Sequence, residues 1–206
     1  MPDRIEVASS GRARCRACRR SIAKGEERYA EAVPNPVAEG ESQHYYHLIC
    51  AAERRPKPFA TFLETLEPAR ADSQELLGAA RLALAHHRLE RLGVLERSKS
   101  ARANCRHCRE PIDKDGWRVA LQPIEDGRLA SWGFLHLACV GAYTGIKPSR
   151  ERLLRYSELG ADDVSTISEL WSALPEREAH ALAAEQAPST DAPAAPDEEG
   201  EPDAPA

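Results

Sequence analysis

The chain has 206 residues, of which 42% are hydrophobic, 5% aromatic and 30% charged. This composition argues against one large hydrophobic core, and no run approaches the ~20 apolar residues of a membrane span, so we expect small domains and no membrane partner. The net charge of −5 argues against a nucleic-acid partner for the whole chain, but residues 185–206 carry seven acidic and no basic residues, and the rest carries 28 basic against 26 acidic side chains.

The first half of the chain contains a CxxC pair, Cys15 and Cys18, followed by strand and helix patterns. Residues 28–33 and 45–46 are predicted to form short strands, separated by the turn-rich residues 34–40. His47 and Cys50 are three residues apart, so they share one face if they open a helix. A further helix is predicted from Asp72 or Ser73, as its cap, to about Leu92, with Gly93 as its stop.

The second half repeats this order at a period of 90 residues. Cys105 and Cys108 form its CxxC pair, residues 118–121 and 132–135 are predicted strands, and residues 123–129 form a turn-rich loop. His136 and Cys139 repeat the HxxC spacing after a gap of 27 residues, where the first copy has 28. A helix over residues 161–174 follows, and we expect the helices after each HxxC to pack back on their own module.

Three cysteines and one histidine in each copy are the ligand set of a closed, tetrahedral, structural zinc site. The two copies use all six cysteines of the chain. We therefore predict two Zn²⁺ ions, one held by Cys15, Cys18, His47 and Cys50 and the other by Cys105, Cys108, His136 and Cys139. His44 also lies near Cys50 but has no counterpart in the second copy. Metal binding would supply much of the folding free energy, on the order of 10 kcal/mol per site.

A disulfide framework and a redox CxxC are the alternative interpretations of these cysteines. No signal-peptide pattern accompanies them, and each CxxC has a matched HxxC, so zinc is the preferred interpretation. We accordingly expect an intracellular, reducing compartment, which would be the cytoplasm or nucleoid of a bacterium or the nucleus of a eukaryote.

The predicted fold is small α+β, with two tandem zinc-stapled fingers that each combine a CxxC knuckle, a short antiparallel sheet and a helix. Residues 1–93 and 94–184 are the two predicted fingers, each with its following helical segment. Residues 185–206, rich in Ala, Pro, Asp and Glu, are predicted to be a disordered acidic tail. Such a tail either serves solvation alone or competes with nucleic acid for a basic surface.

The residues around each CxxC pair resemble a known family. Ile5-Glu6 and Leu95-Glu96 precede the first cysteine of their copies at the same distances, and so do Ser10-Gly11-Arg12-Ala13 and Ser100-Ala101-Arg102-Ala103. Ile22, Lys24 and Arg28 follow in one copy, and Ile112, Lys114 and Arg118 follow in the other. Together with the long gap before HxxC, this pattern resembles the PARP-type zinc finger. That finger is the module by which poly(ADP-ribose) polymerases and one eukaryotic DNA ligase sense DNA breaks.

The resemblance implies binding at DNA strand breaks, by structure rather than by sequence. By position, Arg12, Arg28, Arg102 and Arg118 would clamp backbone phosphates, a role that suits the planar guanidinium. Ile124 and Leu129 would be the apolar contacts to a base pair exposed by the break. The corresponding loop of the first finger offers only Val37, Ala38 and Ser42, beside Glu39 and Glu41. We therefore expect the second finger to be the better DNA binder.

Two functional hypotheses follow. The first is a zinc-dependent DNA-binding protein that recognises strand breaks or distorted DNA; backbone contacts and stacking alone leave RNA open as the ligand. The alternative is a zinc-stabilised protein-interaction or scaffold module without DNA binding of its own. We expect neither an enzyme nor a small-molecule substrate, because four protein ligands close each metal site and no spare cysteine or Gly-rich phosphate loop remains.

Overall fold

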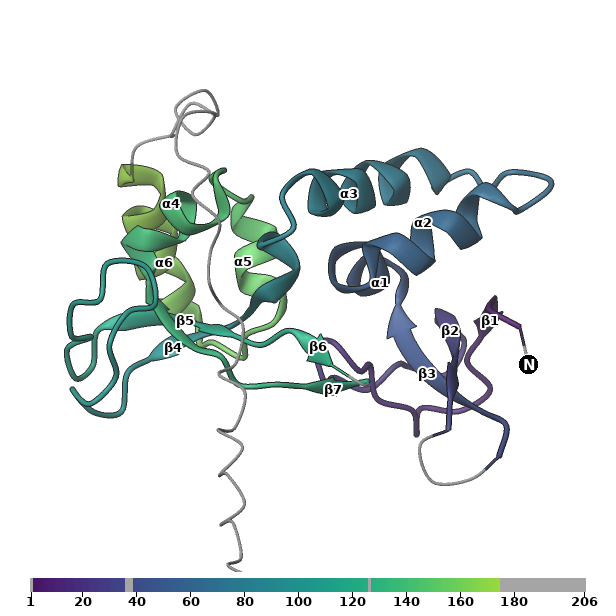
Figure 1. Ribbon diagram of the computed structural model, residues 1–206, viewed down its shortest axis with the longest axis horizontal. Helices are drawn as coiled ribbons and strands as arrows, with labels where there is room; N and C mark the ends of the chain where they lie inside the picture. The colour runs from purple at the N-terminus through teal and green to yellow at the C-terminus, as the bar shows by residue number, and fades with distance from the viewer. Residues whose placement is uncertain (1, 36–38, 126, 175–206) are drawn as a thin grey trace, which may run out of the picture.

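The computed structural model describes residues 2–35, 39–125 and 127–174. Within these ranges the chain forms two α+β modules that lie side by side (Figure 1). No helix among the residues described is both long and apolar enough to cross a membrane. The tail predicted at residues 185–206 lies outside the described ranges.

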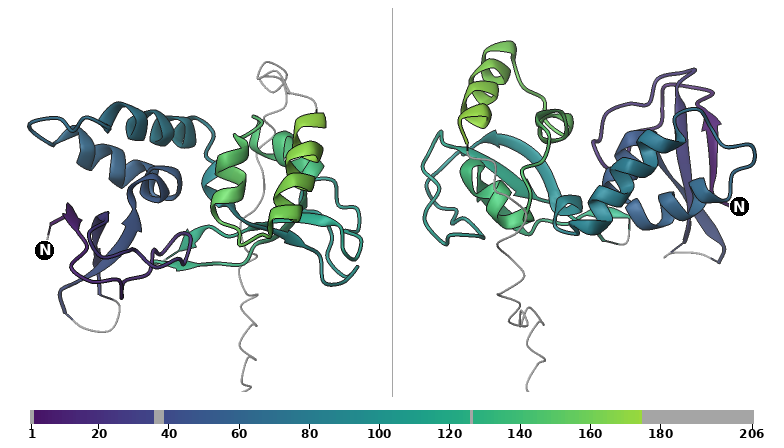
Figure 2. Two further views of the ribbon diagram at one scale, coloured as in Figure 1. Left: turned by 180° about the vertical axis from the view of Figure 1, so that it is seen from behind. Right: turned by 90° about the horizontal axis from the view of Figure 1, so that it is seen from above.

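The first module is built on a three-stranded antiparallel sheet. β1 (Arg4–Val7), β2 (Glu27–Pro34) and β3 (Glu41–His47) stand in that order. The helices α1 (Leu48–Arg54), α2 (Pro56–Glu64) and α3 (Ser73–Ala85) gather on one side of the sheet (Figure 2). Tyr29, Tyr46 and Phe59 are fully buried between the sheet and the helices, with the ring centroids of Tyr29 and Phe59 4.9 Å apart.

The second module repeats the sheet and adds a hairpin. Its sheet has the order β4 (Leu92–Arg97), β5 (Trp117–Leu121) and β8 (Gly133–His136), and β6 (Ile124–Glu125) pairs with β7 (Arg128–Leu129). The remaining elements are η1 (Leu89–Arg91), η2 (Leu137–Cys139), α4 (Val140–Thr144), α5 (Arg150–Arg155) and α6 (Ala161–Ala173). Ile167 and Trp171 of α6 pack on the same core as Leu95 and Leu135 of the sheet.

The predicted strands and the helix over residues 161–174 are present, but several other segments differ from the sequence-based expectation. α3 ends at Ala85 instead of Leu92, because Leu89 and Leu92 are buried in the core of the second module. The predicted stop, Gly93, lies inside β4, so the expected boundary between residues 93 and 94 falls within a strand. The loop expected at residues 123–129 forms the β6–β7 hairpin. The helices α2 and α5 have no counterpart in the prediction.

Candidate metal centres and nucleic-acid interface

The first Cys3His group lies where the CxxC turn meets the start of α1. Cys15 and Cys18 sit in a tight turn in which the Arg19 N–H donates to the Cys15 carbonyl at 2.9 Å. His47 ends β3 and directly precedes α1, which carries Cys50. The Nδ1 atom of His47 lies 3.3 Å from Sγ of Cys18 and 3.8 Å from Sγ of Cys50. The predicted ligands are therefore together.

The second group has the same geometry. The Arg109 N–H donates to the Cys105 carbonyl at 2.9 Å, and His136 ends β8 as His47 ends β3. Its Nδ1 lies 3.4 Å from Sγ of Cys108 and 3.9 Å from Sγ of Cys139. In this module a 3₁₀ turn, η2, places Cys139, where the first module uses an α-helix.

Both groups fit zinc. In each, the four ligand atoms lie within 4.8 Å of one another. Tetrahedral zinc with bonds of about 2.3 Å to sulfur and 2.0–2.1 Å to nitrogen separates neighbouring ligand atoms by about 3.6–3.8 Å. The second imidazole nitrogen is also engaged: Nε2 of His136 lies 3.0 Å from the Pro111 carbonyl and Nε2 of His47 lies 3.7 Å from Glu26. Such contacts orient a metal-bound imidazole. Each group could hold one zinc ion, two in all.

The surroundings of the cysteines favour thiolates at selected positions. Burial raises the pKa of Cys105, but hydrogen bonds from the backbone N–H groups of Cys108 and His136 outweigh it and bring the pKa to about 7. Hydrogen bonds from the Cys15 and Cys50 side chains lower the pKa of Cys18. A thiolate is the form that ligates zinc.

The two groups differ in exposure. Cys15 is 1% and Cys50 2% exposed in the first group, whereas Cys108 of the second group is exposed to solvent. The second site is therefore the more accessible of the two to chelators and oxidants.

Arg28 and Arg118, two of the four predicted phosphate clamps, are buried inside their modules. Arg28 is 9% exposed and donates to Glu6 from Nε and Nη2, while its guanidinium carbon lies 3.7 Å from the centre of the Tyr45 ring. Arg118 is 8% exposed and makes the matching contacts to Glu96 and Phe134. Each pair joins the first strand of its sheet to the second. In this arrangement the two arginines stabilise the sheets and do not face solvent as a phosphate clamp would.

Arg12 and Arg102, the other two clamps, are exposed. Each stands three residues before the first cysteine of its copy, and neither has an ion pair or side-chain hydrogen bond within the described ranges. They are available to an anionic ligand.

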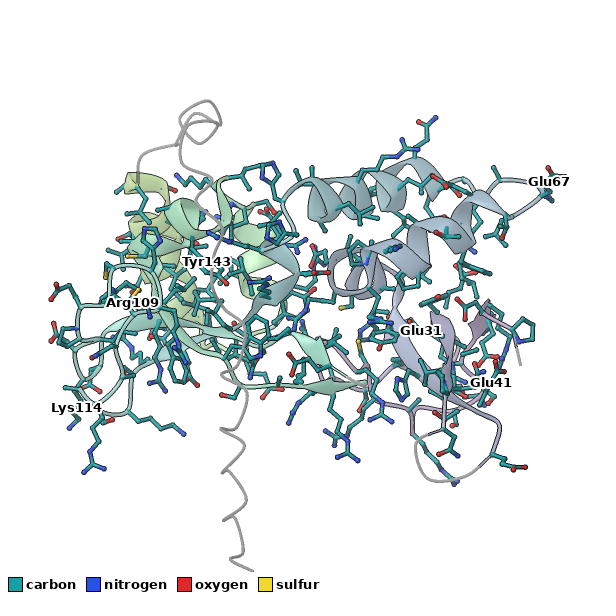
Figure 3. All side chains as sticks on the ribbon, viewed as in Figure 1. Glu31, Glu41, Glu67, Arg109, Lys114 and Tyr143 are labelled. Atoms are coloured by element: carbon teal, nitrogen blue, oxygen red, sulfur yellow. The ribbon has the colours of Figure 1, made fainter. Side chains whose placement is uncertain are left out.

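The predicted apolar contacts Ile124 and Leu129 lie on the hairpin, which reaches across to the first module. Ile124 packs against the core of the first module, and Leu129 is half-buried. Ile124, which the sequence suggested as a contact to an exposed base, is thus in contact with the neighbouring module instead. Trp132, which follows the hairpin, is 39% exposed instead. Arg109 and Lys114 lie at the outer end of the second module, away from the first (Figure 3).

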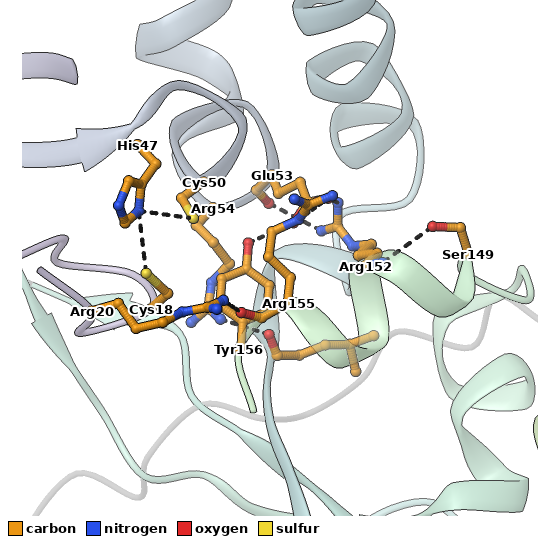
Figure 4. Close-up of polar contacts among 11 residues, drawn as sticks. Cys18, Arg20, His47, Cys50, Glu53, Arg54, Ser149, Arg152, Arg155 and Tyr156 are labelled. Carbon is orange, nitrogen blue, oxygen red and sulfur yellow. Dashed lines mark hydrogen bonds and ion pairs between the residues drawn. The ribbon is translucent and has the colours of Figure 1, made fainter. Parts of the chain in front are cut away.

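A largely buried joint of polar side chains holds the two modules together. Glu53, Arg54, Arg152 and Tyr156 are buried in it, and Arg155 lies at its partly exposed edge. Glu53 accepts from the Tyr156 hydroxyl at 2.6 Å and lies 3.6 Å from Arg152 and 3.3 Å from Arg155. Arg54 donates to the carbonyls of Leu92, at 2.6 Å, and Gln122. The joint lies beside Cys18, His47 and Cys50 (Figure 4). Sequence reasoning missed it, because charged residues on short helices carry no signal that they are buried.

Comparison with curated proteins points to one group of relatives. Poly [ADP-ribose] polymerase 1 of Gallus gallus is 29% identical over 191 residues, which is 81% of this chain and 19% of the relative. Poly [ADP-ribose] polymerase 1 of Danio rerio is 30% identical over 139 residues, or 59% of this chain and 13% of the relative. The chain thus spans less than a fifth of the length of these relatives. No family model matches the chain. The similarity indicates a region related to these polymerases, and the two Cys3His groups fit zinc fingers.

Proposed function

We propose that this protein is a zinc-dependent DNA-binding protein that recognises strand breaks or distorted DNA by structure rather than by sequence. One observation carries the proposal: Arg12 and Arg102 occupy equivalent positions of the two copies, are exposed, and lack an acidic partner among the residues described. Free guanidinium groups at matched positions suit phosphate oxygens, which they can grip in bidentate fashion. The similarity to poly(ADP-ribose) polymerases supports the same assignment.

Recognition of a break also needs a surface on which an unstacked base can rest. Trp132 meets this need in the second module, because its ring is partly exposed and the Arg91 guanidinium lies 5.0 Å from the ring centre. Arg106 donates from Nε to the Trp132 carbonyl at 2.9 Å and places a second positive charge nearby. Aromatic rings flanked by arginine are favourable stacking platforms, worth about 1–3 kcal/mol per base. We assign this role to Trp132 in place of Ile124.

The proposal includes no catalytic step. Each Cys3His group would supply four protein ligands to a zinc ion, a set that is typical of closed structural sites without a position for substrate or water. The metal supplies structural stability when bound, and the side chains around it do the recognition. Six cysteines used as metal ligands are typical of a reducing compartment, so we propose an intracellular location.

The test is fluorescence anisotropy of the zinc-loaded protein against a nicked duplex and the matching intact duplex, at two salt concentrations. A preference for the nick that weakens with salt would support break recognition, because phosphate contacts release counterions. Equal, salt-sensitive binding to both would reduce the protein to a nonspecific backbone binder.

A protein-interaction scaffold is the second candidate, and the burial of Arg28 and Arg118 in internal ion pairs favours it. Absence of binding to either duplex would select this candidate. The search would then turn to protein partners.

A further inference from the structure

A basic groove runs between the two modules, at the contact of the first CxxC turn with the β6–β7 hairpin. Its volume is about 730 Å³, within the size range of ligand sites. One wall comes from the first module and the other from the hairpin of the second. We call it the inter-module groove. The residues that line it include Arg12, Arg14, Arg16, Arg19, Tyr45 and Arg128.

The arginines of this groove have no carboxylate partner among the residues that the structure describes. All five arginines of the lining are exposed, and none forms an ion pair with a carboxylate within the described ranges. Among the described residues, those that line the groove include no Asp or Glu side chain. Like charges that converge without a counterion raise the local potential and favour an anionic ligand.

The groove exists only because the hairpin is seated on the first module. Ile124 packs into the first core, and Gly127 lies over His44 with φ +71. A Cβ atom on Gly127 would lie 1.8 Å from Cε1 of His44, so no other residue fits there without displacement. Arg128 follows directly and is thereby held opposite the arginines of the CxxC turn. Both modules are needed to build the site.

We propose that the inter-module groove binds one strand of nucleic acid, the unpaired strand at a gap or flap, through its phosphates; this inference rests on the DNA-binding function proposed above. Arginines on facing walls can engage successive phosphates of a single backbone from two sides. The groove is too small to enclose a duplex. The acidic segment of this chain, residues 185–206, is the competing anionic ligand, and it carries seven negative charges in 22 residues. A nucleic-acid strand carries one negative charge per nucleotide. The strand therefore matches the closely spaced arginines better than the acidic segment does.

The experiment compares three probes in anisotropy titrations of the full chain loaded with zinc: a nicked duplex, a duplex with a gap of several nucleotides, and a short oligothymidine. The test variants are Arg16→Gln and Arg128→Gln, one from each wall, and Gly127→Ala, which removes no charge. The control is Arg81→Gln on α3, across the molecule from the hairpin (Figure 1). The Arg81 side chain is 68% exposed, so its loss should not disturb the fold.

We expect the wild type to bind the gapped duplex more tightly than the nicked one. Each wall variant should lower affinity for the gap and the oligothymidine roughly tenfold and reduce the salt slope by about 0.7 per lost phosphate contact. Gly127→Ala should also lose the preference for the gapped duplex over the nicked one, because the added methyl group displaces Arg128. Binding to the nick should stay unchanged, and Arg81→Gln should behave as the wild type.

Wall variants that bind the gap and the oligothymidine as tightly as the wild type does, while the wild type still binds the nick, would overturn the groove but leave the proposed function standing. A wild type that binds none of the three probes would overturn both. A competition experiment completes the test, in which labelled oligothymidine is displaced by a peptide of residues 185–206 or by unlabelled oligothymidine. If the peptide displaces it at the lower concentration, the assignment is overturned in favour of an acidic peptide.

Discussion

Replacing Glu53 by Gln tests whether the buried joint fixes the two modules to each other. The Glu53 side chain is 5% exposed and is the carboxylate that faces Arg152, itself 6% exposed, and Arg155. Glutamine keeps the shape and can still accept from the Tyr156 hydroxyl, but it removes the negative charge. Arg152 then stays buried without a counter-charge.

The expected cost follows from this geometry. Breaking a buried ion pair by removing one partner destabilises a protein by roughly 3–5 kcal/mol. Because the Tyr156 hydrogen bond is retained, we expect Glu53→Gln to cost about 3 kcal/mol. For a chain of this length the melting temperature should fall by about 6–12 °C. The loss should also separate the unfolding of the two modules, because few other charged contacts cross between them.

Calorimetry of the zinc-loaded protein measures both effects. Glu64→Gln is the matched control, since Glu64 is 57% exposed and lies 3.7 Å from Arg81, and such surface pairs contribute little. An unchanged midpoint and a single transition in Glu53→Gln, indistinguishable from Glu64→Gln, would refute the joint as the element that couples the modules.

Three further predictions concern the metal, the arginines and acid. Native mass spectrometry should find two zinc ions per wild-type chain and one after Cys50→Ala; two ions in the variant would reject Cys50 as a ligand. Arg118→Gln should lower stability by about 2 kcal/mol and leave the salt slope of DNA binding unchanged. Arg102→Gln should lower that slope by roughly one and leave the melting temperature unchanged. If instead Arg118→Gln lowers the slope and Arg102→Gln does not, Arg118 is the residue that contacts phosphate. Hydrogen bonds from Arg70 lower the pKa of Glu27, so this pair stabilises the fold above about pH 4.5 and less as the pH falls below it. The difference in melting temperature between wild type and Arg70→Gln should therefore shrink in acid, and a difference that grows would contradict the assignment.

Much of the metal chemistry follows from sequence, because ligand type and spacing are local properties. The CxxC and HxxC pairs predicted both groups, and the structure brings all eight side chains together. The repeated Glu6 and Glu96 also contained information on Arg28 and Arg118, since each pair lies at one register position of neighbouring strands. A positional match to a phosphate clamp does not distinguish an arginine that faces solvent from one that faces a cross-strand carboxylate.

The remaining features depend on contacts between distant segments. Leu89 and Leu92 continue the helical spacing of α3, yet they pack into the second core, so the helix ends early. Ile124 is apolar in a polar loop, which is compatible with a base contact and equally with packing on another module. The sequence indicates that such an apolar residue packs against an apolar surface, but it does not indicate which surface.

The helix α1 has only seven residues and is too short to be stable by itself. It carries Cys50 near its start and Glu53 and Arg54 at its end, so one turn separates a zinc ligand from the joint with the second module. Loss of zinc from the first site would release the anchor that aligns this turn. The β6–β7 hairpin and the second module would then no longer be held in a fixed position relative to the first module, and the inter-module groove between them would be lost. We therefore expect a chain with one zinc ion to place its two modules differently, and metal content is a variable to control in every binding assay on this protein.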